Sequence, residues 1–388
     1  MERYGILKVL FLERRSMHFG KISAIALSAL LLSGCSLNLP IAGTASATGS
    51  IWKSFDSGAT FLPKVTVDAE RKISSADVLT LIIDPRHSET IYIGTIASGL
   101  FKTTDGGERW EPLVFPPLKN YGLAFGRDSS DQIYASGVYN NIAKMYRSDD
   151  AGKNWREIYT EPGKGTVITA LQASPDISDV LYAGTSTGVI IKSTNGGATW
   201  DNIGVAKGPV TKILFEKGAP EKIALLVLEK GVDISMDGGK TWNVEAEEGR
   251  ASGAPRENSY EKQNAGSAPS KSAFSQKPEG MTALAGDVAR PGTLYAGAKN
   301  GIFRSRDSGK TWEALDIIES SKKFPVRALA VNPANANEIV YASGNAFYRS
   351  VDGGVKWSTT QLEINRTVNV IEYDPIRPEI LYFALRKF

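Results

Sequence analysis

Cysteine and histidine are nearly missing from this sequence of 388 residues. It holds one cysteine, Cys35, and two histidines, His18 and His87. One thiol cannot form an internal disulfide, so a disulfide framework is excluded. Zinc and iron sites built from several Cys and His ligands are excluded for the same reason, as is haem attached through a CxxCH motif. The sequence therefore predicts no metal site and no cofactor.

A strong net charge and a long hydrophobic run are missing as well. The formal net charge is +3, and the first 34 residues alone carry five basic and two acidic side chains. The rest of the chain is formally neutral, which argues against nucleic acid as a partner. The apolar run at 22–32 is too short to span a membrane. With 42% hydrophobic and 22% charged residues, the composition is that of a globular protein.

The segment 1–34 has the order of a secretory signal peptide. Basic residues precede the apolar run, which leads into the sequence LSGC at 32–35. This ending resembles the lipobox of bacterial lipoproteins, and the resemblance implies that Cys35 is lipidated, with Ser36 typical of sorting to the outer membrane. An ordinary signal peptide with an incidental cysteine is the alternative. Residues 35–49 are predicted to be a tether rich in Ser, Ala and Gly.

An eight-residue box recurs seven times. The third positions of successive boxes lie 42–49 residues apart, except for one interval of 70. Repeats of this period are typical of propellers and solenoids. The boxes are SFDSGATF (54–61), TTDGGERW (103–110), SDDAGKNW (148–155), STNGGATW (193–200), SMDGGKTW (235–242), SRDSGKTW (305–312) and SVDGGVKW (350–357).

The residue types of the box indicate a tight turn. A carboxylate at the third position can accept hydrogen bonds from backbone N–H groups two or three residues on. Glycine at the fifth position supplies the positive φ that reverses the chain, and the final Trp buries a large ring. We therefore interpret the third-position side chains as structural rather than catalytic. They are Asp56, Asp105, Asp150, Asn195, Asp237, Asp307 and Asp352.

The pattern S/T-x-D-x-G-x-x-W resembles the Asp-box, or BNR repeat. That repeat is found in sialidases, sortilin ectodomains, xyloglucan-degrading glycosidases and photosystem assembly factors. The departures from it are Asn195 in the fourth box and Phe61 in the first. The resemblance covers 50–388 and implies a propeller fold, but it carries no active site with it.

Three further strands are expected in each unit. Runs rich in β-branched and aromatic residues, such as 78–85, 90–95 and 99–103, are separated by Pro and Gly turns, and the box opens a fourth strand. Four strands in about 45 residues make the blade of a β-propeller, which leaves few sheet edges exposed. Six complete units run approximately 78–115, 121–160, 167–206, 209–246, 281–318 and 326–362.

Two half-units remain at the ends of the repeat region. Residues 368–388 supply the first two strands of a blade, and residues 50–64 supply the last two. Joining them completes a seventh blade. We therefore predict an all-β fold, a single seven-bladed β-propeller over 50–388 with four-stranded blades and two-plus-two closure. A linear solenoid, which would leave both half-units unpaired, is the alternative.

The interval of 70 residues contains an insertion at about 247–280. In this segment 18 of 34 residues are Gly, Ala, Ser or Pro. Such a composition cannot bury enough apolar surface to order itself, so we predict a flexible insertion. It is either a tolerated loop or a segment that folds on contact with a partner.

Propeller topology indicates where a site would lie. The loops between blades, and those between second and third strands, share one face, and the boxes lie on the other. Loops on a rigid ring carry function, so we expect the site on the first face. Its aromatic, basic and amide side chains suit a protein or glycan partner. The candidate binding residues are Lys119, Tyr121, Tyr139, Asn140, Asn141, Lys299, Phe324 and Arg366.

Glycoside hydrolysis is the catalytic alternative, because two carboxylates suffice for it. The chain lacks the Arg-Ile-Pro element of sialidases, and xyloglucan-degrading enzymes of this repeat type pair two propellers. A Ser-His-Asp triad would need His87, which falls in a turn on the box face. The candidate carboxylates on the loop face are Asp68, Glu70, Asp77, Glu161, Glu229 and Glu319.

The leading hypothesis is a lipid-anchored, non-catalytic and monomeric propeller at the bacterial cell envelope. It would bind a protein partner, such as a membrane protein, as an assembly or scaffolding factor, which is the role of the photosystem factors that it resembles. An envelope glycan-binding protein or glycoside hydrolase is the alternative. No nucleic acid is expected as a partner.

Replacing the only cysteine tests the anchor. Because the lipid would be attached to Cys35, the Cys35→Ser protein should move from the membrane fraction to the soluble fraction. Fractionation followed by immunoblotting measures this. Unchanged membrane association of Cys35→Ser would contradict the lipobox interpretation.

Overall fold

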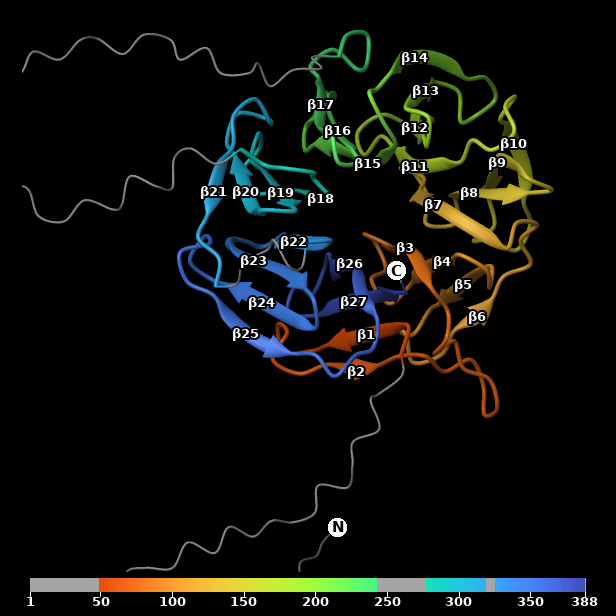
Figure 1. The fold of residues 1–388 in the computed structure, drawn as a ribbon. Coiled ribbons are helices and arrows are strands. Elements are labelled where there is room, and N and C mark those ends of the chain that lie inside the picture. The colour runs from red at the N-terminus through yellow and green to blue at the C-terminus, as the bar shows by residue number, and fades with distance from the viewer. Residues whose placement is uncertain (1–48, 243–276, 319–324, 388) are drawn as a thin grey trace, which may run out of the picture. The chain divides into compact units, whose positions relative to one another are not determined.

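The computed structural model describes residues 49–242, 277–318 and 325–387. These residues form 27 strands in seven antiparallel sheets, arranged as a ring of blades (Figure 1). In the described part of the chain, no helix has the length and apolar character needed to cross a membrane. The predicted signal peptide, the tether through 48 and the insertion from 243 to 276 lie outside the described residues.

The seven sheets follow one another in chain order. The first three are β3 (Val78–Ile83), β4 (Ile91–Thr95), β5 (Leu100–Thr103) and β6 (Glu111–Pro112); β7 (Lys119–Phe125), β8 (Ile133–Tyr139), β9 (Ile142–Ser148) and β10 (Arg156–Thr160); and β11 (Ile168–Ala173), β12 (Leu181–Thr185), β13 (Val189–Ser193) and β14 (Asp201–Val205). The next three are β15 (Val210–Glu216), β16 (Ala219–Val227) and β17 (Gly231–Ser235); β18 (Ala283–Gly286), β19 (Leu294–Ala298), β20 (Gly301–Ser305) and β21 (Glu313–Leu315); and β22 (Ala328–Asn332), β23 (Asn335–Ser343), β24 (Ala346–Ser350) and β25 (Ser358–Gln361).

The seventh blade joins the two ends of the repeat region, as predicted. Its strands are β26 (Thr367–Tyr373), β27 (Leu381–Arg386), β1 (Ile51–Ser54) and β2 (Leu62–Pro63), in that order across the sheet. The antiparallel register places Ile51 opposite Ala384. The first strands of the seven blades contact one another in a closed circle, so the ring is complete and the solenoid alternative is wrong. The fold is a seven-bladed β-propeller.

Burial follows the position of each strand in its blade. Second strands such as β4, β12 and β19 are buried at every residue, because a neighbouring blade covers each face of the sheet. Fourth strands such as β10 and β14 are largely exposed at the rim. For the β15–β17 blade three strands are described, and the fourth strand predicted after Trp242 falls outside the described residues.

Each box folds as one turn held by two side chains. In the first box Ser54 Oγ donates to Asp56 Oδ1 at 2.8 Å and accepts the Gly58 N–H at 2.8 Å. Asp56 Oδ1 also accepts the Thr60 N–H at 2.9 Å. The acceptor therefore reaches an N–H four residues on, rather than only the two or three expected. Asn195 keeps the same turn because its amide oxygen accepts the Thr199 N–H at 2.9 Å.

The glycine at the fifth box position has positive φ in all seven boxes, between 85° and 95°. The residue before it is also left-handed, with φ from 56° to 77°, even where it is Ser57, Ala151 or Ser308. Two consecutive left-handed residues turn the backbone sharply. The carbonyl of the fourth position then becomes an acceptor for the preceding blade.

We call the contact that uses this carbonyl the inter-blade latch. It consists of a Tyr on the second strand and a basic residue on the third, paired across the sheet. Between blades β11–β14 and β15–β17, Tyr182 OH and Lys192 Nζ both donate to the Gly238 carbonyl, at 2.8 and 3.0 Å. Five blades carry such a pair: Tyr92 with Lys102, Tyr134 with Arg147, Tyr182 with Lys192, Tyr295 with Arg304, and Tyr382 with Lys53.

All five pairs reach the next box. Tyr92 OH donates to the Ala151 carbonyl at 3.0 Å, and Tyr382 OH donates to the Gly106 carbonyl at 3.2 Å. Where the Tyr makes no such bond the basic residue does: Arg147 donates to the Gly196 carbonyl, and Arg304 donates to the Gly353 carbonyl at 3.1 Å.

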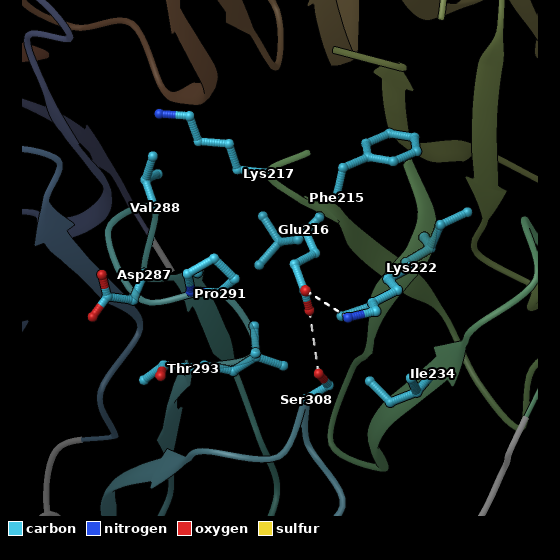
Figure 2. A pocket seen from close by; sticks show the side chains of 16 residues that line it. Phe215, Glu216, Lys217, Lys222, Ile234, Asp287, Val288, Pro291, Thr293 and Ser308 are labelled. Atoms are coloured by element: carbon cyan, nitrogen blue, oxygen red, sulfur yellow. Dashed lines mark hydrogen bonds and ion pairs between the residues drawn. The ribbon is translucent and has the colours of Figure 1, made fainter. Parts of the chain in front are cut away.

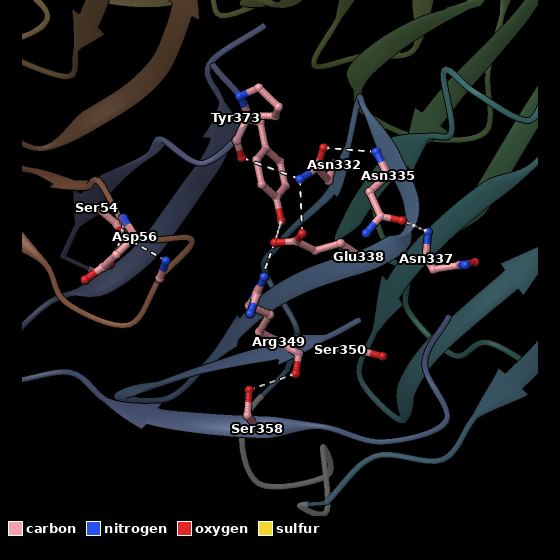
Figure 3. Close-up of polar contacts among 12 residues, drawn as sticks. Ser54, Asp56, Asn332, Asn335, Asn337, Glu338, Arg349, Ser350, Ser358 and Tyr373 are labelled. Carbon is pink, nitrogen blue, oxygen red and sulfur yellow. Dashed lines mark hydrogen bonds and ion pairs between the residues drawn. The ribbon is translucent and has the colours of Figure 1, made fainter. Parts of the chain in front are cut away.

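The β22–β25 blade uses a different polar contact (Figure 3). Val340 stands where the other blades have Tyr, and its cross-strand partner Arg349 donates to Glu338 at 2.8 Å. This buried carboxylate also accepts from Asn332 at 3.1 Å and from Tyr373 OH, on the neighbouring blade, at 3.3 Å. Burial raises the pKa of Tyr373, so it stays a donor.

Removing one latch hydroxyl should weaken the propeller slightly. Tyr182→Phe keeps the ring and deletes the hydrogen bond to Gly238, so we expect a loss of about 1 kcal/mol in the free energy of unfolding. Urea denaturation measures it. Tyr139→Phe, which changes an exposed tyrosine, is the control and should leave stability unchanged. Equal stability of both variants would show that the latch does not hold the blades together.

A buried carboxyl should make stability depend on pH. Asp233 on β17 is 6% exposed, and burial raises its pKa to about 6 from the ordinary 3.8. The folded state therefore favours the protonated form, and stability is lost as pH rises from about 4 to 6. Asp233→Asn should be more stable than the parent at pH 7.5, by at most about 3 kcal/mol. The gain should vanish near pH 4, and urea denaturation at both pH values checks this.

Candidate functional site

Five of the eight candidate binding residues lie on the β7–β10 blade. Lys119 begins β7, Tyr121 sits in a bulge of the same strand, and Tyr139 ends β8. Asn140 and Asn141 form the turn to β9, with φ of 51° and 61°. Asn tolerates this left-handed conformation better than most residues, which explains two of them in succession. The turn is therefore a rigid projection of the loop face.

The other candidates lie on different blades. Lys299 follows β19 and forms an ion pair with Glu229 at 2.9 Å, which joins the turns of two adjacent blades. Arg366 precedes β26 and is 8% exposed, because its guanidinium donates to the Ser75 and Ala76 carbonyls and to Asp77. It holds the loop at 65–77 against the last blade. Phe324 lies outside the described residues. The structure thus groups five candidates and separates Lys299 and Arg366 from them.

Sequence reasoning missed two exposed apolar side chains beside this group. Val114 and Leu118 are 88% and 63% exposed, in the loop that connects β6 to β7, and Tyr139 is 43% exposed. Lys119 pairs with Val138, so Leu118, the residue before β7, and Tyr139, the last residue of β8, lie next to that pair. The signal was the sequence FPPLK at 115–119, because a Leu placed after two prolines in a loop has no sheet to pack against.

The loop-face patch is the set of residues at the loop-face edge of the β7–β10 blade. It combines apolar side chains, one lysine and a rigid amide turn. Single exposed apolar residues are ordinary on a protein surface, but adjacent ones mark interaction sites. The patch consists of Leu118, Lys119, Tyr139, Asn140 and Asn141.

The candidate carboxylates have separate local partners. Asp77 accepts from Arg366 and from the Lys387 N–H, at 2.9 and 2.8 Å. Asp68 accepts backbone N–H groups and the Arg71 guanidinium in an exposed turn, and these bonds lower its pKa. Glu161 accepts from Tyr159 OH at 3.0 Å. Glu70 is exposed in the same turn as Asp68, and Glu319 lies outside the described residues.

These environments do not favour an acid catalyst. The ion pair with Lys299 lowers the pKa of Glu229, as the turn does for Asp68, whereas a glycosidase acid needs a raised pKa. A raised pKa occurs at Asp233, inside the sheet of its blade. Within the described residues no group of three or more His, Cys, Asp or Glu side chains could hold a metal ion.

A serine, a histidine and an aspartate do meet on the box face. His87 Nδ1 lies 3.1 Å from Ser130 Oγ and 3.5 Å from Asp84 Oδ2. A triad needs one ring nitrogen for the serine and the other for the aspartate, so this contact through a single nitrogen cannot relay a proton. It is a turn contact between two blades.

Two kinds of solved structure share this fold. One is a GH74 xyloglucanase from Xanthomonas campestris, with a TM-score of 0.61, 15% identity, and coverage of 80% of this chain and 51% of that chain. The other is YCF48. The structure from Cyanidioschyzon merolae has a TM-score of 0.58, 15% identity and coverage of 80% and 95%, and YCF48 bound to D1 peptide has 0.57, 18%, and 80% and 92%.

Curated relatives by sequence are xyloglucanases. Xyloglucanase Xgh74A of Acetivibrio thermocellus is 24% identical over 343 residues, which cover 71% of this chain and 37% of that protein. A xyloglucanase of Hypocrea jecorina is 24% identical over 180 residues, covering 46% and 20%. The chain thus spans 37% or less of the length of these two curated relatives.

A family model matches residues 128–367, which is more than half of the chain. The match begins in the β7–β10 blade and ends at the first residue of β26, so most of the ring is included. This chain therefore belongs to the family described as the DUF6242 beta propeller domain.

Proposed function

We propose that this chain is a non-catalytic propeller, anchored to the bacterial cell envelope by lipid on Cys35, that binds a protein partner as an assembly or scaffolding factor. The observation that carries the proposal is the loop-face patch. Exposed Leu118 and Tyr139 beside Lys119 give apolar area with a positive charge at its edge, which suits a peptide segment with apolar and acidic side chains.

The comparisons support a binding role in two ways. YCF48, whose chain is covered to 92%, has been solved with a D1 peptide, so a single propeller of this architecture can hold a peptide. The xyloglucanases are matched over about half of their structures or less. The ring therefore accounts for more of the peptide-binding neighbour than of the xyloglucanase.

The hydrolase alternative rests on a specific observation too. The curated relatives by sequence are xyloglucanases, so a carbohydrate ligand for the loop face is the second candidate. Against catalysis, the described candidate carboxylates Asp77, Glu161 and Glu229 are each bonded to a neighbour of their own. Binding of a glycan without cleavage fits these contacts better than hydrolysis.

A pull-down with matched variants tests the proposed role. The tagged protein is recovered from detergent-solubilised membranes, and its partners are quantified by mass spectrometry. The variant Leu118→Ala, Lys119→Glu, Tyr139→Ala should lose the partner by about tenfold or more, because such anchors typically contribute 1–2 kcal/mol each. Its melting temperature should be unchanged, since all three side chains are on the surface.

The control changes apolar side chains on the opposite face. Val351→Ala with Val355→Ala alters two residues of one box that are 54% and 73% exposed, and it should retain the partner fully. Equal recovery from the patch variant and the control would contradict the proposal. Release of reducing sugar from xyloglucan that is abolished by Asp77→Asn or Glu229→Gln would establish the hydrolase instead.

A further inference from the structure

The β15–β17 blade has neither the inter-blade latch nor the buried carboxylate that takes its place in the β22–β25 blade. In the β15–β17 blade the cross-strand pair is Ala224 with Ile234, at the positions where five blades have a Tyr with a Lys or Arg. Neither side chain can donate a hydrogen bond. The facing acceptor position is Ser308, the fourth residue of the next box. The aromatic ring and the basic group of the latch are thus missing from this position, which faces the β18–β21 blade.

The facing strand of the next blade, β18, also has a smaller side chain than the matching strands of other blades. Phe125 and Phe215, at the ends of their first strands, pack on the latch rings Tyr92 and Tyr182, with centroids 5.5 Å apart in both pairs. The register places Gly286 of β18 at that position. Its φ is not positive, so the backbone does not require glycine there. An added Cβ would meet only Leu214 and Leu294, both at 4.0 Å.

These small residues leave a pocket between the two blades (Figure 2). Its cavity volume is about 70 Å³, several times the roughly 10–15 Å³ that a single water molecule needs. The walls are mainly apolar and come from β15, β16, β17, β18 and β19. The apolar side chains that these strands contribute are Leu214, Phe215, Ile223, Ala224, Ile234 and Leu294.

Glu216 is one of the polar side chains that line the pocket. Glu216 forms an ion pair with Lys222 at 2.7 Å and accepts from Ser308 Oγ at 3.3 Å (Figure 2). The side chain of Glu216 is 13% exposed, so its carboxylate is largely withdrawn from water. Because Lys222 balances its charge, the site favours a neutral ligand that can donate a hydrogen bond over an ion.

We propose that this pocket binds a small neutral phenol, whose ring occupies the place that a latch tyrosine fills in five other blades. The repeat itself defines the ligand chemistry: Tyr92, Tyr182 and Tyr382 each place a phenol against the next blade and donate to its box. The hydroxyl of the ligand would donate to the Ser308 carbonyl or to Glu216. The site lies on the box side, so it is separate from the loop-face patch and does not rest on the proposed function.

The probe is p-cresol, which is the side chain of tyrosine as a free molecule. Titration into the full chain, followed by NMR chemical shifts and by melting temperature, should give saturable binding with a Kd of about 1 mM or tighter. Toluene lacks the hydroxyl and should bind about three- to tenfold more weakly. No saturable response to p-cresol overturns the proposal, and equal affinity for toluene overturns its hydrogen bond.

Two variants that fill the pocket locate the binding. Ala224→Tyr restores the residue of the other blades, so it should raise the melting temperature and abolish the p-cresol response. Gly286→Val fills the opposite wall and should weaken binding at least tenfold, which keeps the test valid if the tyrosine is not accommodated. The control is Lys230→Ala, which changes an exposed lysine in the turn between β16 and β17 that does not line the pocket, and it should leave affinity unchanged. Binding that persists in both filled variants would place the phenol elsewhere and overturn the proposal.

Discussion

The propeller depends on one backbone carbonyl in each of five boxes. Two successive left-handed residues present this carbonyl to the preceding blade, where a tyrosine or a basic side chain donates to it. The Ser or Thr at the start of the box and the acceptor at its third position hold that conformation, as Ser54 and Asp56 show. A local turn is thereby converted into a contact between blades. Buried donors without such an acceptor would carry a desolvation cost of about 1–3 kcal/mol each.

The two blades without the usual pair show what the latch does. In one, Glu338 accepts hydrogen bonds from Arg349, Asn332 and Tyr373. This buried carboxylate with its three donors closes the gap to the next blade. In the other, Ala224 and Ile234 leave the gap open. The same position in the repeat therefore carries a hydrogen-bonded ring, an ion pair or a pocket, while the sheets around it keep their register.

The blades and their closure could be predicted because their determinants are local. Box glycines, Pro and Gly turns and β-branched runs recur at a fixed period, and each acts within a few residues. The latch could not be predicted this way, because Tyr182 and Lys192 meet a carbonyl of Gly238 in another unit. The candidate site could be predicted only in part, because some of its contacts also join residues far apart in the chain. The turn of Asn140 and Asn141 could be read from the sequence, whereas the burial of Arg366 depends on residues 75–77, at the other end of the chain.

The closure of the seventh blade has a mechanical consequence. Ile51 lies opposite Ala384, and the Leu385 N–H donates to the Ser50 carbonyl at 2.9 Å. The chain therefore enters β1 and leaves β27 at the same end of the sheet. Tension applied between these two points would break the hydrogen bonds between β1 and β27 one after another, instead of loading all of them together in shear. The ring would therefore resist force least at the seam where it is joined, and stretching would open that seam before it separated any other pair of strands.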